Sequence, residues 1–281
     1  MKYPFVLAAF ADEAGASIPE QISAMAENGV SGLEIRGIDG RNVTSLTLAE
    51  AKEIRAQLED KGLSVWSIGS PIGKINITDP FGPHLDLYKH TLELAEVLGA
   101  KAFRLFSFFM PKDEDPEIYR DEVLERMSHF AEEARGLDLL VCHENEKGIY
   151  GDIATRCKVI YENLPSIGAI FDPANFIQSG QDTLEAWEML GKYVKYMHIK
   201  DCFADGSVVP AGKGIGNLPA ILEAYGAQGG KVLTLEPHLT VFKGLSDLER
   251  EGERSAVGGF AYPSARAAFD AAVASLREII A

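Results

Sequence analysis

The chain has 281 residues, of which 46% are hydrophobic and 25% are charged, the proportions of an ordinary globular protein. Its formal net charge of −15 argues against nucleic acid and anionic membranes as partners, because both attract basic patches. No apolar run is long enough to span a bilayer. The N-terminus lacks a signal sequence and the three cysteines form no CxxC pair, so we expect a cytoplasmic protein.

Apolar segments and amphipathic segments alternate along the whole chain. Ser17 is expected to cap the first helix, with Pro19 in its first turn. The apolar segments predict strands at residues 5–10, 32–36, 63–68, 101–106, 139–145, 169–171, 194–199 and 231–235. The amphipathic segments predict helices at residues 17–28, 47–61, 86–98, 116–135, 152–163, 183–190, 218–224 and 262–280, with a polar insertion at 243–259.

Eight strand–helix alternations in a chain of this length predict a single α/β domain, a (β/α)8 TIM barrel over residues 1–281. The rival fold is a doubly wound open sheet, which usually carries a glycine-rich turn after its first strand. Residues 10–15 do not supply such a turn. We therefore expect one barrel.

Four consecutive strands are expected to end on side chains that can bind a metal. The strand at 139–145 carries Glu144, and the next three end at Asp172, His198 and Glu236. The carboxyl ends of barrel strands meet at one face, where barrel enzymes hold their catalytic groups. Carboxylate oxygens and imidazole nitrogens are ligands of divalent metals. We expect these four side chains to surround one divalent ion.

Two neighbours of these residues have predictable directions. Lys200 follows His198 by two residues, so both side chains should point to the same face of the strand. Lys200 could contact an anionic or carbonyl oxygen of a substrate, or it could pair with a structural carboxylate. His143 precedes Glu144 directly, so its side chain should point to the opposite side and have a supporting or structural role.

Charged residues also stand near the ends of the earlier strands. Glu34 shares a strand face with Arg36, and Arg104 should also face the interior, where such groups either neutralise each other or bind substrate hydroxyls. Lys74 follows the third strand and suits a phosphate or carboxylate of a substrate, unless it is a solvated surface lysine. The glycine-rich loop at 210–216 lacks the Walker spacing, so its glycines should serve to let the backbone approach the site.

Short motifs at residues 143–145, 171–175, 198–201, 210–216 and 235–236 coincide with the expected strand ends and the glycine-rich loop. Together they resemble the motifs of the xylose-isomerase-like TIM barrels, the sugar phosphate isomerase/epimerase family. The resemblance covers essentially the whole chain.

The resemblance implies one divalent metal ion, commonly Mn, Mg, Co or Zn, held by Glu144, Asp172, His198 and Glu236. In the ketose-epimerase branch of that family, the two glutamates also move protons at the carbon next to the carbonyl. Asn175 stands where epimerases of that branch tend to carry a histidine that touches the substrate. The resemblance also implies a homodimer or homotetramer.

We therefore expect a metal-dependent isomerase or epimerase that acts on a sugar or sugar-like carbonyl compound by proton transfer through a metal-stabilised enediolate. Glu144 and Glu236 would be acid and base, and Lys200 would assist electrostatically. The expected substrate-binding residues are Glu34, Lys74, Arg104 and Asn175. A dehydratase or lyase of the inosose or dehydroshikimate type and a non-catalytic sugar-binding barrel are the alternatives. An endonuclease-like hydrolase is disfavoured by the acidic charge balance and by only six histidines.

Overall fold

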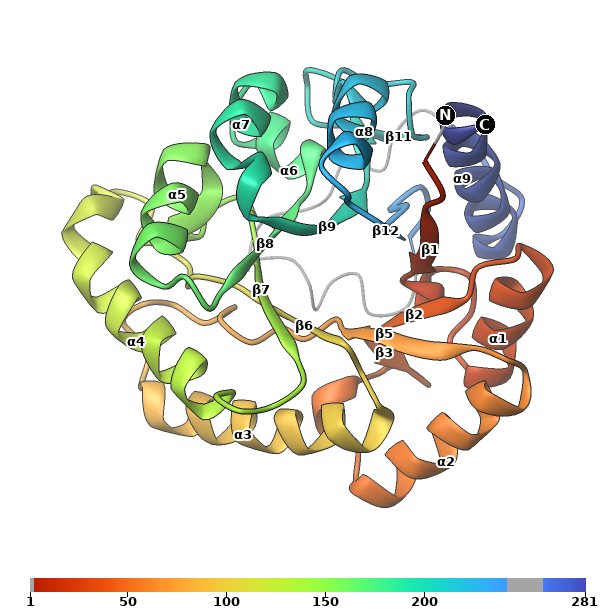
Figure 1. The fold of residues 1–281 in the computed structure, drawn as a ribbon, viewed down its shortest axis with the longest axis horizontal. Helices are drawn as coiled ribbons and strands as arrows, with labels where there is room; N and C mark the ends of the chain where they lie inside the picture. The colour runs from red at the N-terminus through yellow and green to blue at the C-terminus, as the bar shows by residue number, and fades with distance from the viewer. Residues whose placement is uncertain (1–2, 242–259) are drawn as a thin grey trace.

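The computed structural model describes residues 3–241 and 260–281, and its centre is a closed barrel of parallel strands (Figure 1). Neighbouring strands follow the order β1, β12, β9, β8, β7, β6, β5 and β2 around the barrel. Their bounds are β1 Val6–Ala9, β2 Gly32–Ile35, β5 Ser64–Ile68, β6 Ala102–Leu105, β7 Leu140–Glu144, β8 Gly168–Phe171, β9 Val194–Ile199 and β12 Val232–Leu235. Two small antiparallel pairs lie outside the barrel, β3 Gly37–Ile38 with β4 Arg41–Asn42 and β10 Asp201–Cys202 with β11 Val208–Val209. The predicted (β/α)8 fold is confirmed.

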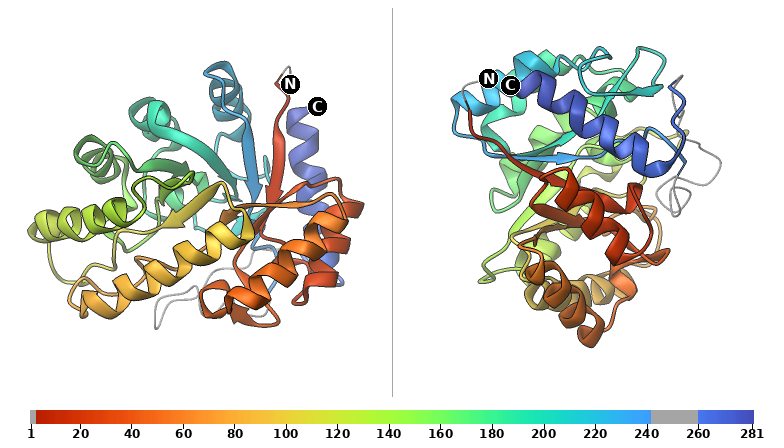
Figure 2. Two further views of the ribbon diagram at one scale, coloured as in Figure 1. Left: turned by 60° about the horizontal axis from the view of Figure 1, so that its bottom comes forward. Right: turned by 90° about the vertical axis from the view of Figure 1, so that its right-hand side faces the viewer.

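Helices surround the barrel on its outer side (Figure 2). They are α1 Ile18–Glu27, α2 Leu48–Asp60, α3 Phe81–Leu98, α4 Arg120–Glu133, α5 Ala154–Asn163, α6 Pro173–Gln178, α7 Thr183–Leu190, α8 Leu218–Ala227 and α9 Ala265–Ile280. Short 3-10 helices occur at Ala11–Glu13, Val43–Ser45, Pro116–Tyr119, Tyr150–Asp152 and Gly191–Tyr193. Helix α9 packs against both α1 and α8, so the last helix closes the ring.

Local sequence signals fix several of the helix starts. Ser17 caps α1 as predicted, and its backbone N–H donates to the Glu20 carboxylate at 2.9 Å in a complete capping box. Thr47 and Glu50 form the same box at the start of α2. Helix α3 ends at Gly99, whose φ of 71° is a left-handed conformation that glycine adopts without strain.

Several helix predictions were inaccurate at their ends, and the helix predicted at 218–224 extends to Ala227. The segment predicted at 86–98 begins earlier, at Phe81, and the last helix begins at Ala265, where Ser264 caps it. The segment at 116–135 is a 3-10 turn followed by α4. Helix α6 was not predicted, because its six residues are too few to show a helical period. The predicted insertion at 243–259 lies outside the described residues.

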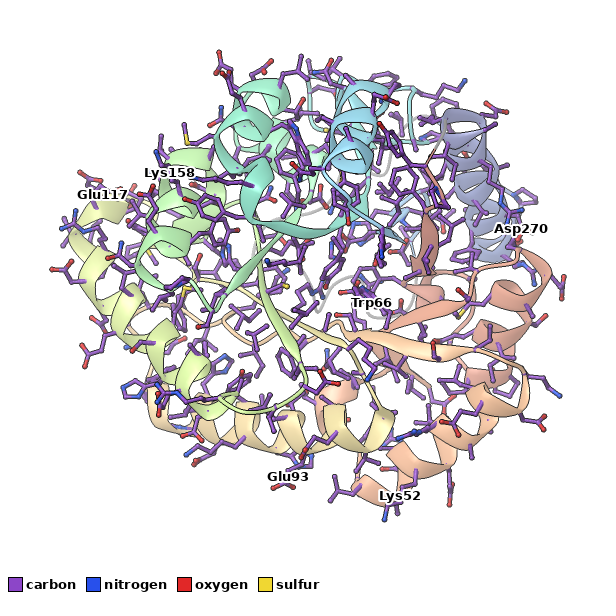
Figure 3. The ribbon with its side chains drawn as sticks, in the orientation of Figure 1. Lys52, Trp66, Glu93, Glu117, Lys158 and Asp270 are labelled. Atoms are coloured by element: carbon purple, nitrogen blue, oxygen red, sulfur yellow. The ribbon has the colours of Figure 1, made fainter. Side chains whose placement is uncertain are left out.

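The main apolar core lies between the barrel and the surrounding helices. A smaller cluster fills the barrel interior, and Trp66 packs against it (Figure 3). The Trp66 ring lies edge-on to that of Tyr196 at a centroid distance of 5.5 Å. Cys142, Cys157 and Cys202 are buried free thiols. Within the described ranges, no helix is long and apolar enough to cross a membrane.

Candidate metal centre

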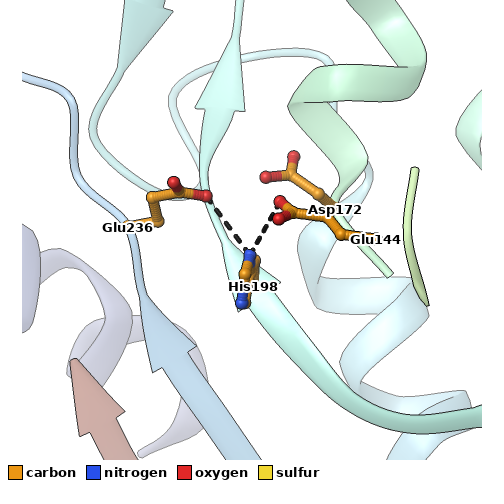
Figure 4. A group of neighbouring side chains, drawn as sticks. All are labelled: Glu144, Asp172, His198 and Glu236. Atoms are coloured by element: carbon orange, nitrogen blue, oxygen red, sulfur yellow. Dashed lines mark hydrogen bonds and ion pairs between the residues drawn. The ribbon is translucent and has the colours of Figure 1, made fainter. Parts of the chain in front are cut away.

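Four side chains converge at the carboxyl ends of β7, β8, β9 and β12 (Figure 4). Glu144 is the last residue of β7, Asp172 follows β8, His198 lies near the end of β9, and Glu236 follows β12. All four are buried, and one potential ligand atom from each lies within 4.8 Å of the others. His198 Nδ1 is 2.8 Å from Glu144 Oε1 and 3.2 Å from Glu236 Oε2. The structure thus brings together the four residues proposed from the sequence as metal ligands.

The chemistry of this donor set fits a divalent ion. Three carboxylates and one imidazole offer the oxygen and nitrogen ligands that Mn, Mg, Co and Zn accept. Among the described residues, Asp172 Oδ2 accepts no hydrogen bond and has only an ion pair with Lys200, at 3.0 Å. Crowding three carboxylates in a buried site is costly unless positive charge is near. The site is therefore built to hold positive charge.

The charges in the centre shift its pKa values in opposite directions. Burial raises the pKa of Asp172 to about 7, although the Lys200 ammonium lowers it, and the neighbouring glutamates add to the rise. Burial also acts to raise the pKa of Glu144, but the charges of His198 and Arg104 outweigh it and lower that pKa to about 2. The carboxyl groups of Asp172 and Glu144 thus differ in pKa, and that of Asp172 is the higher.

Lys200 and Arg104 are the cations nearest to these carboxylates. Lys200 Nζ lies 3.0 Å from Asp172 Oδ2 and 3.2 Å from Glu236 Oε2, so it faces the same side as His198, as its spacing predicted. Arg104 Nη1 donates to Glu144 Oε2 at 3.0 Å and lies 3.7 Å from Glu236 Oε1. Lys200 was expected either to contact a substrate oxygen or to pair with a carboxylate, and in the structure it pairs with two carboxylates.

Glu34 lies behind the imidazole ring, on the side away from the other carboxylates. Its Oε2 is 3.3 Å from His198 Nε2, whereas Nδ1 of the same ring faces Glu144 and Glu236. Its Oε1 accepts hydrogen bonds from Tyr196 at 3.0 Å and from Ser67 at 3.2 Å. Glu34 was expected to bind substrate, but His198 stands between it and the centre.

Asn175 supports the centre from the first turn of α6. Its backbone N–H donates to Asp172 Oδ1 at 2.9 Å, and its side-chain amide donates to Glu144 Oε1 at 3.3 Å and to the Asn145 carbonyl at 2.9 Å. This expected substrate-binding residue therefore contacts two candidate metal ligands.

His143 points away from the centre, as predicted, with its ring nitrogens 3.1 Å from the Tyr161 hydroxyl and 2.9 Å from Ser107 Oγ.

Lys74 is neither solvated nor isolated. Its Nζ pairs with Glu146 at 2.9 Å and lies 4.5 Å from the centroid of the Phe106 ring. Its side chain is only 9% exposed, which excludes the reading as a free surface lysine. Lys74 thus stays a candidate for contact with an anionic part of a substrate.

A second cluster of buried charges adjoins Glu236 and was not proposed as part of the site. Arg36 pairs with Asp12 at 2.9 Å, with Glu13 at 3.1 Å and with Glu236 at 3.3 Å. His238 Nε2 lies 3.4 Å from Glu13 Oε1 and 3.5 Å from Glu236 Oε1. A signal for this cluster existed in the sequence, because the acidic pair directly follows the first strand and Arg36 shares a strand face with Glu34. Instead of pairing as the neutralisation hypothesis suggested, Glu34 contacts Tyr196, Ser67 and His198, and Arg36 pairs with Asp12, Glu13 and Glu236.

The glycine-rich loop approaches a carboxylate that the sequence analysis did not single out. The backbone N–H groups of Gly212, Gly214 and Gly216 donate to the Asp201 carboxylate at 2.9, 3.0 and 2.9 Å, and the Cys202 N–H does so at 2.9 Å. A Cβ at Gly214 would lie 2.3 Å from Asp201 Oδ1. The glycines permit close backbone approach, as predicted, but to Asp201, beside Lys200, rather than to the metal ligands.

A closed parallel barrel with acidic and imidazole ligands at its carboxyl face defines a class of barrel proteins with a candidate divalent-metal centre. The family model described as xylose isomerase-like TIM barrel matches residues 22–252. The chain belongs to this family. A search of curated proteins found no match.

Solved structures of similar fold include members with different described roles. One is an IolI protein with a bound zinc atom, with 15% identity, a TM-score of 0.74, and coverage of 98% of this chain and 97% of that one. Another is the probable 3-DHS dehydratase AsbF of Bacillus anthracis, with 18% identity, a TM-score of 0.68 and 99% coverage of both chains. A third is a D-tagatose 3-epimerase-like protein, with 16% identity, a TM-score of 0.69, and coverage of 81% of this chain and 89% of that one. At these identities, the likenesses establish the fold.

Proposed function

We propose that the protein is a divalent-metal-dependent isomerase or epimerase that acts on a sugar or sugar-like carbonyl compound. The observation that carries this proposal is the convergence of Glu144, Asp172, His198 and Glu236 at the carboxyl face of the barrel. These four side chains would hold the ion. When bound, a divalent ion would polarise a carbonyl oxygen as a Lewis acid. The zinc in the IolI structure supports the choice of a divalent ion for a protein of this fold.

Glu144 and Glu236 are the groups that would move protons. They reach His198 Nδ1 from opposite sides, at 2.8 and 3.2 Å (Figure 4). A carbon held between them could lose a proton to one carboxylate and receive a proton from the other. Return to the opposite face of the same carbon is epimerisation, and return to the neighbouring carbon is isomerisation. Proton transfer by a positioned side chain contributes about 10²–10⁴-fold to a rate.

Three positive side chains lie close to the Glu236 carboxylate, and they would face negative charge that develops on the oxygens of a substrate bound at the centre. Lys200 and Arg104 both lie within 4 Å of Glu236 carboxylate oxygens, and Arg36 contacts the same carboxylate at 3.3 Å. Buried cations already held by hydrogen bonds need little reorganisation during reaction, which makes their electrostatic stabilisation effective. Lys200, Arg104 and Arg36 would thus orient the substrate oxygens and lower the cost of removing the proton.

A dehydratase is the second candidate, because it would begin with the same proton transfer and then expel a hydroxyl group from the adjacent carbon. The fold likeness to the probable dehydratase AsbF favours including it in the test. The two reactions are distinguished by their products: isomerisation conserves the substrate formula, whereas dehydration releases one water.

The test is turnover of a panel of ketoses, inososes and dehydro-sugars in D₂O by the protein loaded with Mn, Mg, Co or Zn. We expect deuterium to enter the product at the carbon that is deprotonated, as followed by ¹H NMR. Glu236→Gln should lower the rate at least about 100-fold, because the amide cannot accept the proton. Glu93→Gln is the matched control, since Glu93 is exposed on the outer helix α3 (Figure 3).

Full activity of Glu236→Gln would remove this glutamate from the mechanism. Binding of a ketose without deuterium exchange in any member of the panel would contradict the enzymatic proposal and support a sugar-binding barrel instead.

A further inference from the structure

Glu34 is a buried carboxylate that the proposed proton transfers do not use. It has no exposed surface, and neither do His198, Tyr196 and Ser67, which surround it. Burying a carboxylate is energetically costly unless its oxygens are paired. The contacts of Glu34 show what it is paired with, and they point to His198.

The two oxygens of Glu34 have separate partners. The hydroxyls of Tyr196 and Ser67 donate to Oε1, and these two hydroxyl oxygens are themselves 3.0 Å apart. The other oxygen, Oε2, lies 3.3 Å from His198 Nε2. A β-bulge between Leu33 and Glu34 shifts the pairing of β2 with β5, so that Glu34 stands opposite Ser67. The carboxylate is therefore fixed on one side by hydroxyls and offers its remaining oxygen to the imidazole.

The imidazole ring of His198 is also held by aromatic neighbours. Phe10 lies edge-on to it at a centroid distance of 5.2 Å, and Tyr196 lies edge-on at 5.6 Å. With this orientation, only Nε2 faces Glu34, and Nδ1 faces Glu144 and Glu236. Both ring nitrogens face carboxylates, which accept hydrogen bonds but cannot donate them. If Nδ1 gives its lone pair to an ion, the proton that stays on the ring is the one on Nε2, which faces Glu34.

We propose that Glu34 is a positioning residue that fixes the orientation and tautomer of His198, so that Nδ1 presents its lone pair to a divalent ion. This inference rests on the proposed metal centre, and it assigns Glu34 to the support of a ligand rather than to the substrate. Partners of this kind orient a ligating histidine and raise its basicity, and their loss typically weakens metal binding about 10–100-fold.

The test is a Co²⁺ titration of the chelator-treated full chain, which gives the Kd and the visible Co²⁺ absorption band together. We expect Glu34→Gln to weaken Co²⁺ binding about 10–100-fold and to change the band, because a neutral amide is a poorer acceptor for Nε2–H. Glu93→Gln should leave the Kd within about twofold of the wild type and the band unchanged. A residue that only stabilised the fold would not change the band of the bound ion.

Tyr196→Phe provides a second variant in case Glu34→Gln does not fold. It keeps the carboxylate and removes one hydroxyl from Oε1, so it should also weaken Co²⁺ binding and alter the band. A wild-type Kd and band in either folded variant would overturn the role of Glu34 while leaving the metal centre intact. Absence of Co²⁺ binding by the wild type would overturn the metal centre and this inference together.

Discussion

Each carboxylate of the candidate metal centre lies against a cationic side chain. Glu144 is paired with Arg104 at 3.0 Å, and Lys200 lies between Asp172 and Glu236 at 3.0 and 3.2 Å. Breaking a buried ion pair by removing one partner is strongly destabilising, because an uncompensated charge stays in the interior. These ion pairs therefore stabilise the buried carboxylates at the carboxyl face of the barrel, which would be unfavourable in apolar surroundings.

His84 gives the protein a predictable pH dependence. Its Nε2 accepts the Gly73 backbone N–H at 2.7 Å, in the loop that carries Lys74. Burial and the positive charge of Arg126 lower the pKa of His84 to about 4, although Asp79 acts in the opposite direction. The unfolded chain, with a histidine pKa near 6.5, thus binds more protons than the folded chain between these values. The contribution of neutral His84 to the free energy of unfolding is fully present above pH 6.5 and is lost as the pH falls towards 4.

We expect His84→Gln, whose amide oxygen can accept the same N–H, to remove this part of the pH dependence. The free energy of unfolding from urea titrations should fall less for the variant than for the wild type between pH 7 and pH 4. The difference should be on the order of 2–3 kcal/mol. Parallel pH curves for the two proteins would show that protonation of His84 does not limit stability.

At the scale of elements, the loop after β11 is tied to the end of β9 through Asp201. Three glycine N–H groups of the loop converge on this carboxylate, which directly follows Lys200. N–H groups that converge in this way form a concave anion-binding arrangement, which is filled here by a carboxylate of the same chain. The loop thereby fixes the strand end from which Lys200 reaches the metal centre.

Substitution in this loop tests how closely it is packed. Gly214→Ala would place a Cβ 2.3 Å from both Asp201 Oδ1 and the Cys202 carbonyl oxygen, so the loop must shift. We expect a loss of about 1–3 kcal/mol in the free energy of unfolding, measured in urea. Gly82→Ala is the matched control, because nothing lies within 4 Å of its added Cβ, and it should be neutral or slightly stabilising. A Gly214→Ala protein as stable as the wild type would contradict the tight packing around Asp201.

The sequence was most informative where signals are local. Capping residues such as Ser17 and the apolar strands are set by neighbours in the chain, and the predicted barrel and the start of α1 followed from them. The convergence of Glu144 with the other three ligands could be predicted because all barrel strands end at one face. The direction of the Glu34 side chain could not be predicted, since it depends on a β-bulge in the pairing of β2 with β5. Likewise, the three loop glycines that donate to Asp201 lie more than ten positions along the chain from it.

At the scale of the whole molecule, the barrel is a scaffold that gathers distant residues at one place. The strands that carry the four candidate ligands span residues 140 to 235, and the cations come from both halves of the chain. The supporting network of Glu34 extends this arrangement into the barrel interior. Fold alone does not assign a reaction, so the proposed activity depends on whether this centre holds a metal ion.

The most direct measurement is the metal content of the purified protein after loading with Mn, Mg, Co or Zn and removal of free ions. The wild type should retain about one divalent ion per chain, in keeping with a single set of three carboxylates and one imidazole. The double variant Glu144→Gln/Asp172→Asn should retain none, because amide oxygens lack the charge that holds the ion. A wild-type protein that retains no divalent ion after loading would contradict the proposed metal centre.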